Sequence, residues 1–465
     1  MEFLKRRGLH IGAVLILLVA LGVTAYPAAL VDNLESATTA IRAGRPDLAL
    51  PALNDAIALE PNIPELHLRA AQGALTTDAP DVATEFLNQL GSDAHLECLQ
   101  LDAALRAGRI DAALAQLPGS RCPEQAAMLY QEADLLVAAG DYQAAADMLK
   151  SLLTSLPATP EASETLGTLL ALQDPESALS RLRLAVDLDP RTTSFADELI
   201  QVIESARSDG NQAYTLAQVG QALARAGRWS MAVAAFENAL ALDPGYTEAR
   251  AYYGLALDRS GQDGLSQLDR AVAEAPQAPL PLVLLGKHWL MGGEPERALE
   301  AYEQAATLAP GDPLIAIDLG AAYAAAGDLQ AAKLAYQYAI DLTPEDAAMW
   351  SLFAQFSLDY EIELTEVGLP AARQAVLLKP RDAATLDRLG YTHFLLGNWT
   401  LAERFILRAI ETDGNLASAR YHLGLLALST GDLVGGRGAL GSALALDPDG
   451  RYGNLARRSL ENLNQ

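Results

Sequence analysis

The residue types that could do chemistry are few in this chain, and they form no catalytic or metal-binding pattern. Six histidines are present, at positions without the mutual spacing of metal ligands. No Walker loop, nucleophile elbow or His-Glu-x-x-His sequence occurs. Residues 436–441, GRGALG, have the form GxGxxG, but no strand precedes them, and a dinucleotide site needs strand, turn and helix together. We therefore expect no catalytic residues, no cofactor, no metal and no small-molecule substrate.

Composition indicates an all-α chain. Apolar residues make up 51% of the 465 residues, with alanine prominent among them, and aromatic residues only 6%. Alanine is the best helix former, whereas strands favour β-branched and aromatic residues. The net charge of −26 repels phosphate backbones, so we expect no nucleic-acid partner. The acidity either keeps a long apolar chain soluble or favours basic partners.

A fixed period is the strongest signal in the sequence. Prolines that follow Leu-Asp or a similar pair stand at positions 244, 276, 310, 344, 380 and 448, mostly at intervals of roughly 34 residues. Gly414 stands at the midpoint of the one double interval. Other positions recur within each unit. In 279–310 they are Leu285, Gly286, Trp289, Gly293, Ala298, Tyr302, Ala305 and Pro310. In 313–344 they are Leu319, Gly320, Tyr323, Gly327, Ala332, Tyr336, Ala339 and Pro344.

This pattern resembles the tetratricopeptide repeat family and covers nearly everything from residue 30 to residue 448. The resemblance implies a right-handed superhelical solenoid of antiparallel helix pairs. The glycine after leucine and the alanines are small, so that paired helices can nest. The middle glycine, as at Gly227, Gly327 or Gly431, can close the first helix in a left-handed conformation. The residue after it suits the cap of the second helix, as at Asp328, Asn398 and Asp432.

The repeats define the expected domain organisation. Residues 32–190 form an N-terminal array, in which units 64–91 and 94–120 are degenerate with shortened second helices. Residues 191–212 contain an extra helix and a break before the C-terminal array, 213–448. Residues 449–465 are expected to cap the last apolar face, as a solenoid requires. Two additional residues around 360–367 indicate a surface loop.

The N-terminus carries a membrane signal. Residues 1–7 form a basic tail with Lys5, Arg6 and Arg7, and residues 8–31 are uncharged and long enough to span a bilayer. The basic flank predicts a single-pass anchor with a cytoplasmic N-terminus and an extracytoplasmic repeat body. The alternative is a signal peptide cleaved after Ala25, which exports the body without an anchor.

The two cysteines fall in neighbouring predicted units. Cys98 lies near the start of one first helix, and Cys122 precedes the next. Because neighbouring units stack, the thiols could approach each other, and an exported protein can keep a disulfide. A Cys98–Cys122 bridge and two free thiols are both open at this stage.

The concave groove is the expected binding surface, because in the resembled family the first helices line it and partners lie along it as peptides or helices. The mapped groove residues are Leu280, Val283, Lys287, Met291, Ile317, Gln355, Asp387, Tyr391, Phe394, Tyr421 and Leu425. Lys287 stands almost alone as a cation, and the tyrosine-bearing apolar lining favours a hydrophobic segment. An alternative is that several of these residues pack between helices.

The sequence therefore predicts a non-enzymatic, membrane-anchored scaffold that holds one or more proteins at the cell envelope. An alternative is an accessory or regulatory subunit that positions a membrane enzyme, for example in polysaccharide or envelope assembly. Both interpretations follow from the fold and from the missing catalytic motifs, and fold alone does not determine function.

Overall fold

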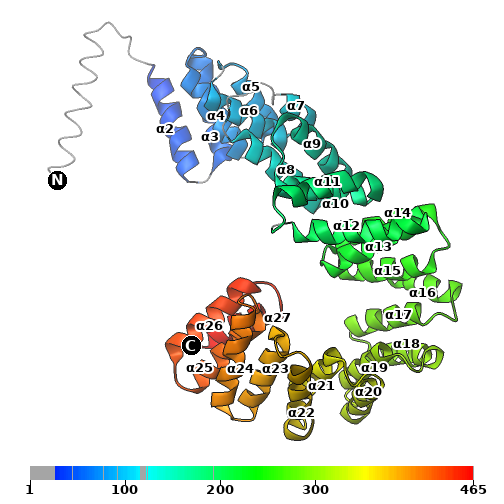
Figure 1. The fold of residues 1–465 in the computed structure, drawn as a ribbon. Coiled ribbons are helices and arrows are strands. Elements are labelled where there is room, and N and C mark those ends of the chain that lie inside the picture. The colour runs from blue at the N-terminus through cyan, green and yellow to red at the C-terminus, as the bar shows by residue number, and fades with distance from the viewer. Residues whose placement is uncertain are drawn as a thin grey trace. The chain divides into compact units, whose positions relative to one another are not determined.

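The computed structural model describes residues 27–463 except 44, 77, 92, 116–121, 123 and 192, and the regular elements of this part of the chain are all helical. Successive helices stack as antiparallel pairs, giving an all-α repeat solenoid (Figure 1). The chain divides into two compact units, unit 1 up to Ala222 and unit 2 from Leu223. This boundary lies inside one helix, Gln212–Arg225.

Unit 1 contains the more irregular repeats. The second helices α5 and α7 are the short ones, with 8 and 6 residues against 14 in α9 and α11. An additional helix, α12, follows the pair α10 and α11 and continues into a short 3-10 helix, η1. The elements are α2 Ala28–Arg42, α3 Pro46–Leu59, α4 Pro64–Thr76, α5 Pro80–Leu87, α6 Ala94–Arg106, α7 Ile110–Ala115, α8 Gln125–Ala139, α9 Tyr142–Ser155, α10 Pro160–Ala171, α11 Pro175–Leu188, α12 Ser194–Ala206, η1 Arg207–Asp209 and α13 Gln212–Arg225, whose end belongs to unit 2.

Unit 2 is more regular, and in most of its repeats a first helix of 13 residues precedes a second helix of 14. The elements are α14 Trp229–Leu242, α15 Thr247–Arg259, α16 Leu265–Glu274, α17 Pro279–Met291, α18 Pro295–Leu308, α19 Pro313–Ala325, α20 Leu329–Leu342, α21 Ala347–Asp359, the π-helix η2 Leu364–Gly368, α22 Leu369–Leu378, α23 Ala383–Leu395, α24 Trp399–Thr412, α25 Ala417–Ser429, α26 Leu433–Leu446 and α27 Arg451–Asn462.

The small residues of the repeat let paired helices touch. A Cβ atom on Gly286 would lie 2.6 Å from Cε1 of Tyr302, and one on Gly320 would lie 2.8 Å from Cδ2 of Tyr336. The second-helix tyrosine therefore sits directly against the backbone of the first helix. This confirms the nesting predicted for the glycine after leucine.

The turns between paired helices use the predicted residues, with one exception. Gly327 has φ +86°, and the carboxylate of Asp328 then accepts a hydrogen bond from the backbone N–H of Ala331 at 2.9 Å. Asp432 caps α26 in the same way. Asn398 occupies the N-cap position of α24 as predicted, but its side chain makes no cap hydrogen bond there.

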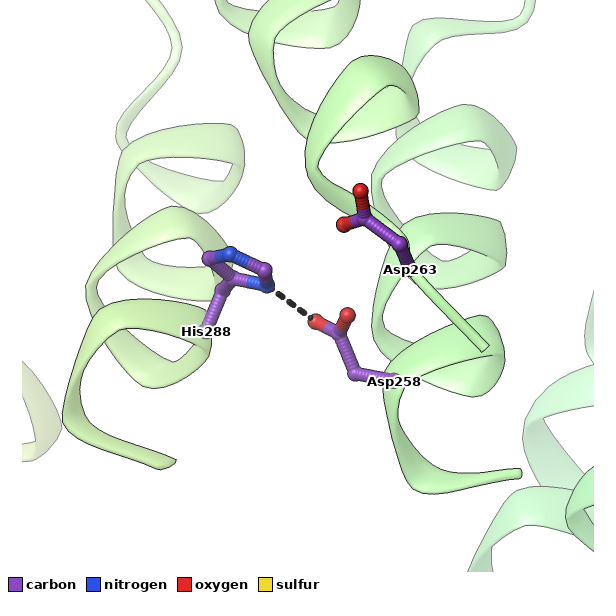
Figure 2. A group of neighbouring side chains, drawn as sticks. All are labelled: Asp258, Asp263 and His288. Carbon is purple, nitrogen blue, oxygen red and sulfur yellow. Dashed lines mark hydrogen bonds and ion pairs between the residues drawn. The ribbon is translucent and has the colours of Figure 1, made fainter. Parts of the chain in front are cut away.

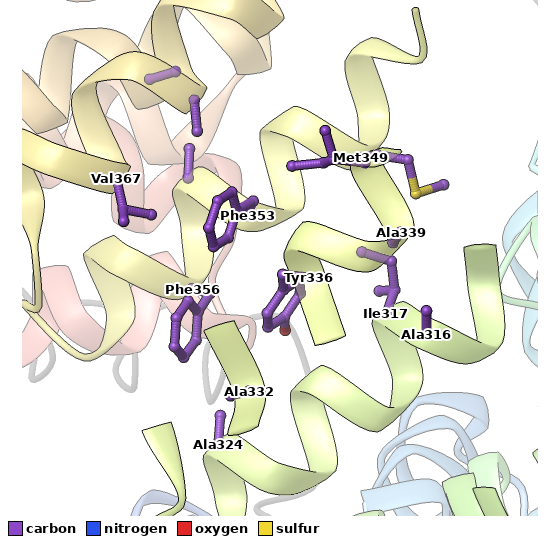
Figure 3. Packing of buried hydrophobic residues seen from close by; sticks show 14 of the residues in the cluster. Ala316, Ile317, Ala324, Ala332, Tyr336, Ala339, Met349, Phe353, Phe356 and Val367 are labelled. Carbon is purple, nitrogen blue, oxygen red and sulfur yellow. The ribbon is translucent and has the colours of Figure 1, made fainter. Parts of the chain in front are cut away.

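The core of unit 2 continues from one repeat to the next through stacked aromatic rings. Tyr336 on α20 lies with its ring centroid 5.0 Å from that of Phe356 and 6.0 Å from that of Phe353, both on α21 (Figure 3). Alanines such as Ala332 and Ala339 fill the space where helices approach most closely. Burial of these rings and methyl groups couples neighbouring repeats, as expected for a solenoid.

The segment expected to form a loop near 360–367 is partly helical. Residues 360–363 form a turn, with Glu361 and Glu363 at φ +50° and +44°, and the π-helix η2 then leads into α22. A π-helical turn accommodates additional residues without a projecting loop. The loop prediction is therefore wrong for residues 364–367.

Residues 1–26, with the predicted basic tail and most of the predicted span, lie outside the described residues. The end of that predicted span, Ala28–Val31, is the first turn of α2, where Leu30 is buried against Ala56 and Leu66. No described helix combines the length and the apolar character needed to cross a membrane.

Candidate functional site

The predicted groove residues lie on the first helices α17, α19, α21, α23 and α25, all within unit 2. The structure does not present them as one continuous apolar surface. On α17 and α19, Met291 is 49% exposed, whereas Ile317 is 8% exposed and belongs to the core (Figure 3). The prediction that Ile317 lines an open groove is wrong, because α20 and α21 cover it.

The other α17 positions are also involved in packing. Leu280 and Val283 are partly buried against apolar clusters between neighbouring helices. Lys287 pairs with Asp318 of α19 at 3.5 Å, so it is not the isolated cation that the sequence suggested. Burial raises the pKa of Asp318, and Lys287 lowers it by a smaller amount. This half of the predicted groove mainly joins repeats to one another.

The other half forms a cleft of about 220 Å³ between α21, α23, α25 and α27, hereafter the C-terminal cleft. Four predicted residues line it: Gln355, Asp387, Tyr391 and Tyr421. Phe394 instead packs against the apolar cluster around α24 and α25, and its ring stacks on that of Tyr391 with centroids 5.9 Å apart. Leu425 is partly buried on α25.

A buried polar network forms one wall of the C-terminal cleft. Asp387 is 3% exposed and His422 is 5% exposed. Nδ1 of His422 donates to Oδ1 of Asp387 at 2.8 Å, and the hydroxyl of Ser418 donates to Oδ2 at 2.6 Å. The ring of Tyr391 stacks on that of His422 with centroids 4.0 Å apart. Asp387 lines the cleft, as predicted for a groove residue, but it is a buried carboxylate at the base of the cleft rather than an exposed charge.

Two arginines also line the cleft, and each is held by a neighbour. Arg388 donates from Nε to the side-chain oxygen of Gln355 at 2.8 Å and also bonds to the hydroxyl of Ser351. Arg451, at the start of α27, donates to Asp359 of α21 at 2.7 Å, across 92 residues of sequence. This ion pair raises the pKa of the Arg451 guanidinium.

The sequence reasoning missed the contribution of α27. The expected role of residues 449–465 was to cap the last repeat, and α27 does pack on α26 and α25. It also places Arg451, Tyr452 and Leu455 in the C-terminal cleft. The aromatic and basic pair Arg451-Tyr452 at the start of an otherwise polar helix is the only sequence signal that could have indicated this.

A second cluster of polar side chains joins α15 to α17 (Figure 2). Ligand-type atoms of Asp258, Asp263 and His288 lie within 4.8 Å of one another. Nδ1 of His288 bonds to Oδ2 of Asp258 at 2.8 Å, while the other Asp258 oxygen accepts the N–H of Gly264 at 2.8 Å. Asp263 accepts the N–H of Leu265. These hydrogen bonds link the α15–α16 turn to α17, and this structural role explains why the three side chains lie close together.

Cys98 and Cys122 form a disulfide in the structure, with Cα atoms 5.0 Å apart. It links α6 to the residues just before α8 and closes a loop that includes α7. A covalent link here spans the part of unit 1 with its shortest second helix, α7.

The GxGxxG stretch lies within α26, as expected. Gly436 is buried there, and a Cβ on it would lie 2.5 Å from Leu428. Without a strand and turn around it, the motif lacks the geometry of a dinucleotide loop. His393, which occupies the repeat position of Trp289, is 2% exposed and stacks on Phe405.

Models of the tetratricopeptide repeat match residues 130–192, 213–246, 259–313 and 289–356. A comparison with curated proteins gave no match. Among solved structures, the APC/C hetero-tetramer Cut9–Hcn1 is 16% identical, with 91% of this chain and 95% of that chain covered and a TM-score of 0.37. Yeast Tom70 is 14% identical, with coverage of 93% and 95% and a TM-score of 0.44. YrrB, a TPR protein with an unusual peptide-binding site, is 20% identical, with coverage of 41% and 97% and a TM-score of 0.30. The chain therefore contains tetratricopeptide repeats.

Proposed function

We propose that this chain is a scaffold at the cell envelope that holds a protein partner in the C-terminal cleft. Tetratricopeptide repeat proteins generally mediate protein–protein interaction and complex assembly. The observation that carries the proposal is the convergence of three first helices and α27 on one cleft. Its side chains are polar and aromatic, the types that concentrate binding energy at protein interfaces.

The backbone at the rim of the cleft supports this assignment. Glu361 lines the cleft and has φ +50°, a conformation that non-glycine residues rarely adopt. The π-helix η2 follows within three residues, and Glu363 is held by an ion pair with Lys333. Strained backbone of this kind persists where its surroundings over-determine it, and such positions cluster at ligand-binding sites.

The lining of the cleft indicates a different kind of partner segment from the one expected from the sequence. A purely hydrophobic segment was expected from the sequence, but the lining includes Asp359, Glu361, Arg388 and Arg451 beside the tyrosines. A segment that buries only apolar groups would take water away from these charges and offer them no new partners beyond those within the chain. We therefore propose a partner segment that brings polar or charged side chains of its own.

We further propose that the repeat body is outside the cytoplasm and is tethered by the N-terminal apolar run. The basic residues before that run support this orientation. The Cys98–Cys122 disulfide supports it as well, because disulfides persist mainly in exported proteins.

Capture from solubilised membranes tests the scaffold function. The tagged full chain is used as bait, and proteins that remain bound are identified by mass spectrometry. Tyr421→Ala, which removes a partly buried ring from the cleft, is expected to lose the principal partner by about tenfold. Tyr338→Ala is the matched control, because Tyr338 lies on the second helix α20, away from the cleft. Equal capture by both variants and the unchanged chain would show that the partner binds elsewhere.

A further inference from the structure

Negative charges outnumber positive charges around the C-terminal cleft once Arg451, a cation from within the chain, is left out of the count. Three carboxylates line it, those of Asp359, Glu361 and Asp387, together with two guanidiniums, those of Arg388 and Arg451. Arg451 comes from α27 and is 62% exposed in its side chain, so it is the cation that can leave most easily. Without it, the carboxylates of Asp359 and Glu361, and the buried, hydrogen-bonded carboxylate of Asp387 at the base, face the single guanidinium of Arg388.

The aromatic residues of the cleft suit a planar cation. Rings of Tyr421 and Tyr452 lie with centroids 5.9 Å apart, and both approach His422. The guanidinium carbon of Arg451 already lies 5.7 Å from the centroid of the Tyr452 ring, within the range of a cation–π contact.

The electrostatic environment agrees with this preference. The pKa of Tyr391 is raised to about 12, first by burial and then by Tyr421, Glu361, Tyr452 and Asp359. Burial disfavours any charge, but the additional raising of the Tyr391 pKa by Glu361 and Asp359 reflects negative charge beside the ring, which favours a cation there.

We propose that the C-terminal cleft takes an arginine side chain from the partner, and that Arg451 occupies that place when the partner is absent. The inference rests on the proposed function and names its recognition chemistry. The space beside Arg451 in the cleft is about 220 Å³, smaller than the roughly 300 Å³ at which whole-ligand pockets begin, so it fits part of one side chain rather than a small molecule. The net charge of −26 adds a general attraction for a basic partner.

Arginine fits better than lysine for a geometric reason. The site combines a carboxylate at Asp359 with aromatic faces at Tyr421 and Tyr452, and a guanidinium can pair with the first while lying over the second. Arg451 makes this combination of contacts from within the chain. An arginine of the partner would take over the contacts of Arg451 with Asp359 and Tyr452, and the side chain of Arg451 would move out into water.

Ligand-detected NMR on the full chain in detergent micelles tests the proposal. The probe is a capped five-residue peptide with arginine between glycine pairs, compared with the same peptide carrying citrulline, which has the same shape without the charge. The arginine peptide is expected to bind about tenfold more tightly. Arg451→Gln should strengthen its binding by a few fold, and Asp359→Asn should weaken it by about tenfold.

Two matched controls separate local effects from the overall charge. Arg458→Gln removes the same charge from an exposed position of α27, and Glu411→Gln removes an exposed carboxylate from α24. Both should bind the arginine peptide like the unchanged chain. Equal binding of the citrulline peptide, tighter binding of a glutamate peptide, or weaker binding by Arg451→Gln would overturn the proposal. If the arginine peptide fails while Tyr421→Ala still loses its captured partner, the scaffold function stands and only the arginine assignment falls.

Discussion

Asp387 and His422 share a 2.8 Å hydrogen bond between Oδ1 and Nδ1, although they lie on the first helices of consecutive repeats and 35 residues apart. Ser418 occupies the second carboxylate oxygen at 2.6 Å. All three side chains are buried, so the carboxylate has exchanged water for two donors from the next repeat. The bond is therefore a polar joint between α23 and α25.

Removing this carboxylate should destabilise unit 2 strongly. Asp387→Ala leaves His422 and Ser418 without their acceptor in a buried site, which we expect to cost about 3 kcal/mol of unfolding free energy. Denaturant unfolding monitored by circular dichroism measures it. Ser418→Ala, which leaves the His422 bond intact, should cost about 1 kcal/mol. A near-neutral Asp387→Ala would mean that the network adds nothing to the joint between repeats.

The nesting of paired helices gives a second prediction. Gly286→Ala places a methyl group 2.6 Å from the fully buried ring of Tyr302, and we expect a loss of about 2 kcal/mol from the forced separation of α17 and α18. Gly311→Ala is the control, because a Cβ there meets no atom within 4 Å. Thermal melting of both variants should show a lower melting temperature for the first alone. Equal melting temperatures would show that the helices can separate at little cost.

Whether the sequence predicted a feature depends on how far apart in the sequence the residues that form it lie. The contact of Gly286 with Tyr302 lies within one repeat, and the period of the sequence predicted it. The burial of Asp387 depends on which residue of the next first helix faces it, and the period says nothing about that register. The pair Arg451 and Asp359 joins elements with two whole repeats between them, so no local pattern could indicate it.

The disulfide should stabilise the degenerate part of unit 1 in particular. Cys98 and Cys122 are 24 residues apart, and closing a loop of that length stabilises the folded state by about 3 kcal/mol in the chain-entropy description. We expect Cys98→Ala with Cys122→Ala to raise hydrogen exchange in α6, α7 and α8. Exchange in α17 to α20 of unit 2 serves as the internal control and should not change. Unchanged exchange in α6 to α8 would show that the helix pairs are stable without the link.

His393 predicts a pH dependence of stability. Burial, followed by the nearby charge of Arg373, lowers the pKa of His393 below its ordinary value of 6.5. The folded chain then binds fewer protons than the unfolded chain, so the free energy of unfolding decreases as pH falls below 6.5 toward the folded-state pKa. His393→Phe keeps a ring against Phe405 and removes the titration. Its denaturation midpoint should fall less than that of the unchanged chain between pH 7 and pH 5, and an identical loss in both would assign the acid sensitivity to other groups.

The membrane topology can be tested with the full chain. Attachment to the membrane and the side on which the repeats lie are separate properties, so each needs its own measurement. The uncharged run that begins at Gly8, preceded by Lys5, Arg6 and Arg7, predicts an anchor with the repeat body outside. The protein should remain in the membrane fraction after carbonate washing, and protease added from outside should cut it. A variant lacking residues 1–26 keeps the described repeats and should appear in the soluble fraction. Release of the unchanged chain by carbonate, with a mature N-terminus at Tyr26, would instead establish signal-peptide cleavage. Resistance to protease in intact cells, together with a reduced Cys98–Cys122 pair, would place the repeats in the cytoplasm.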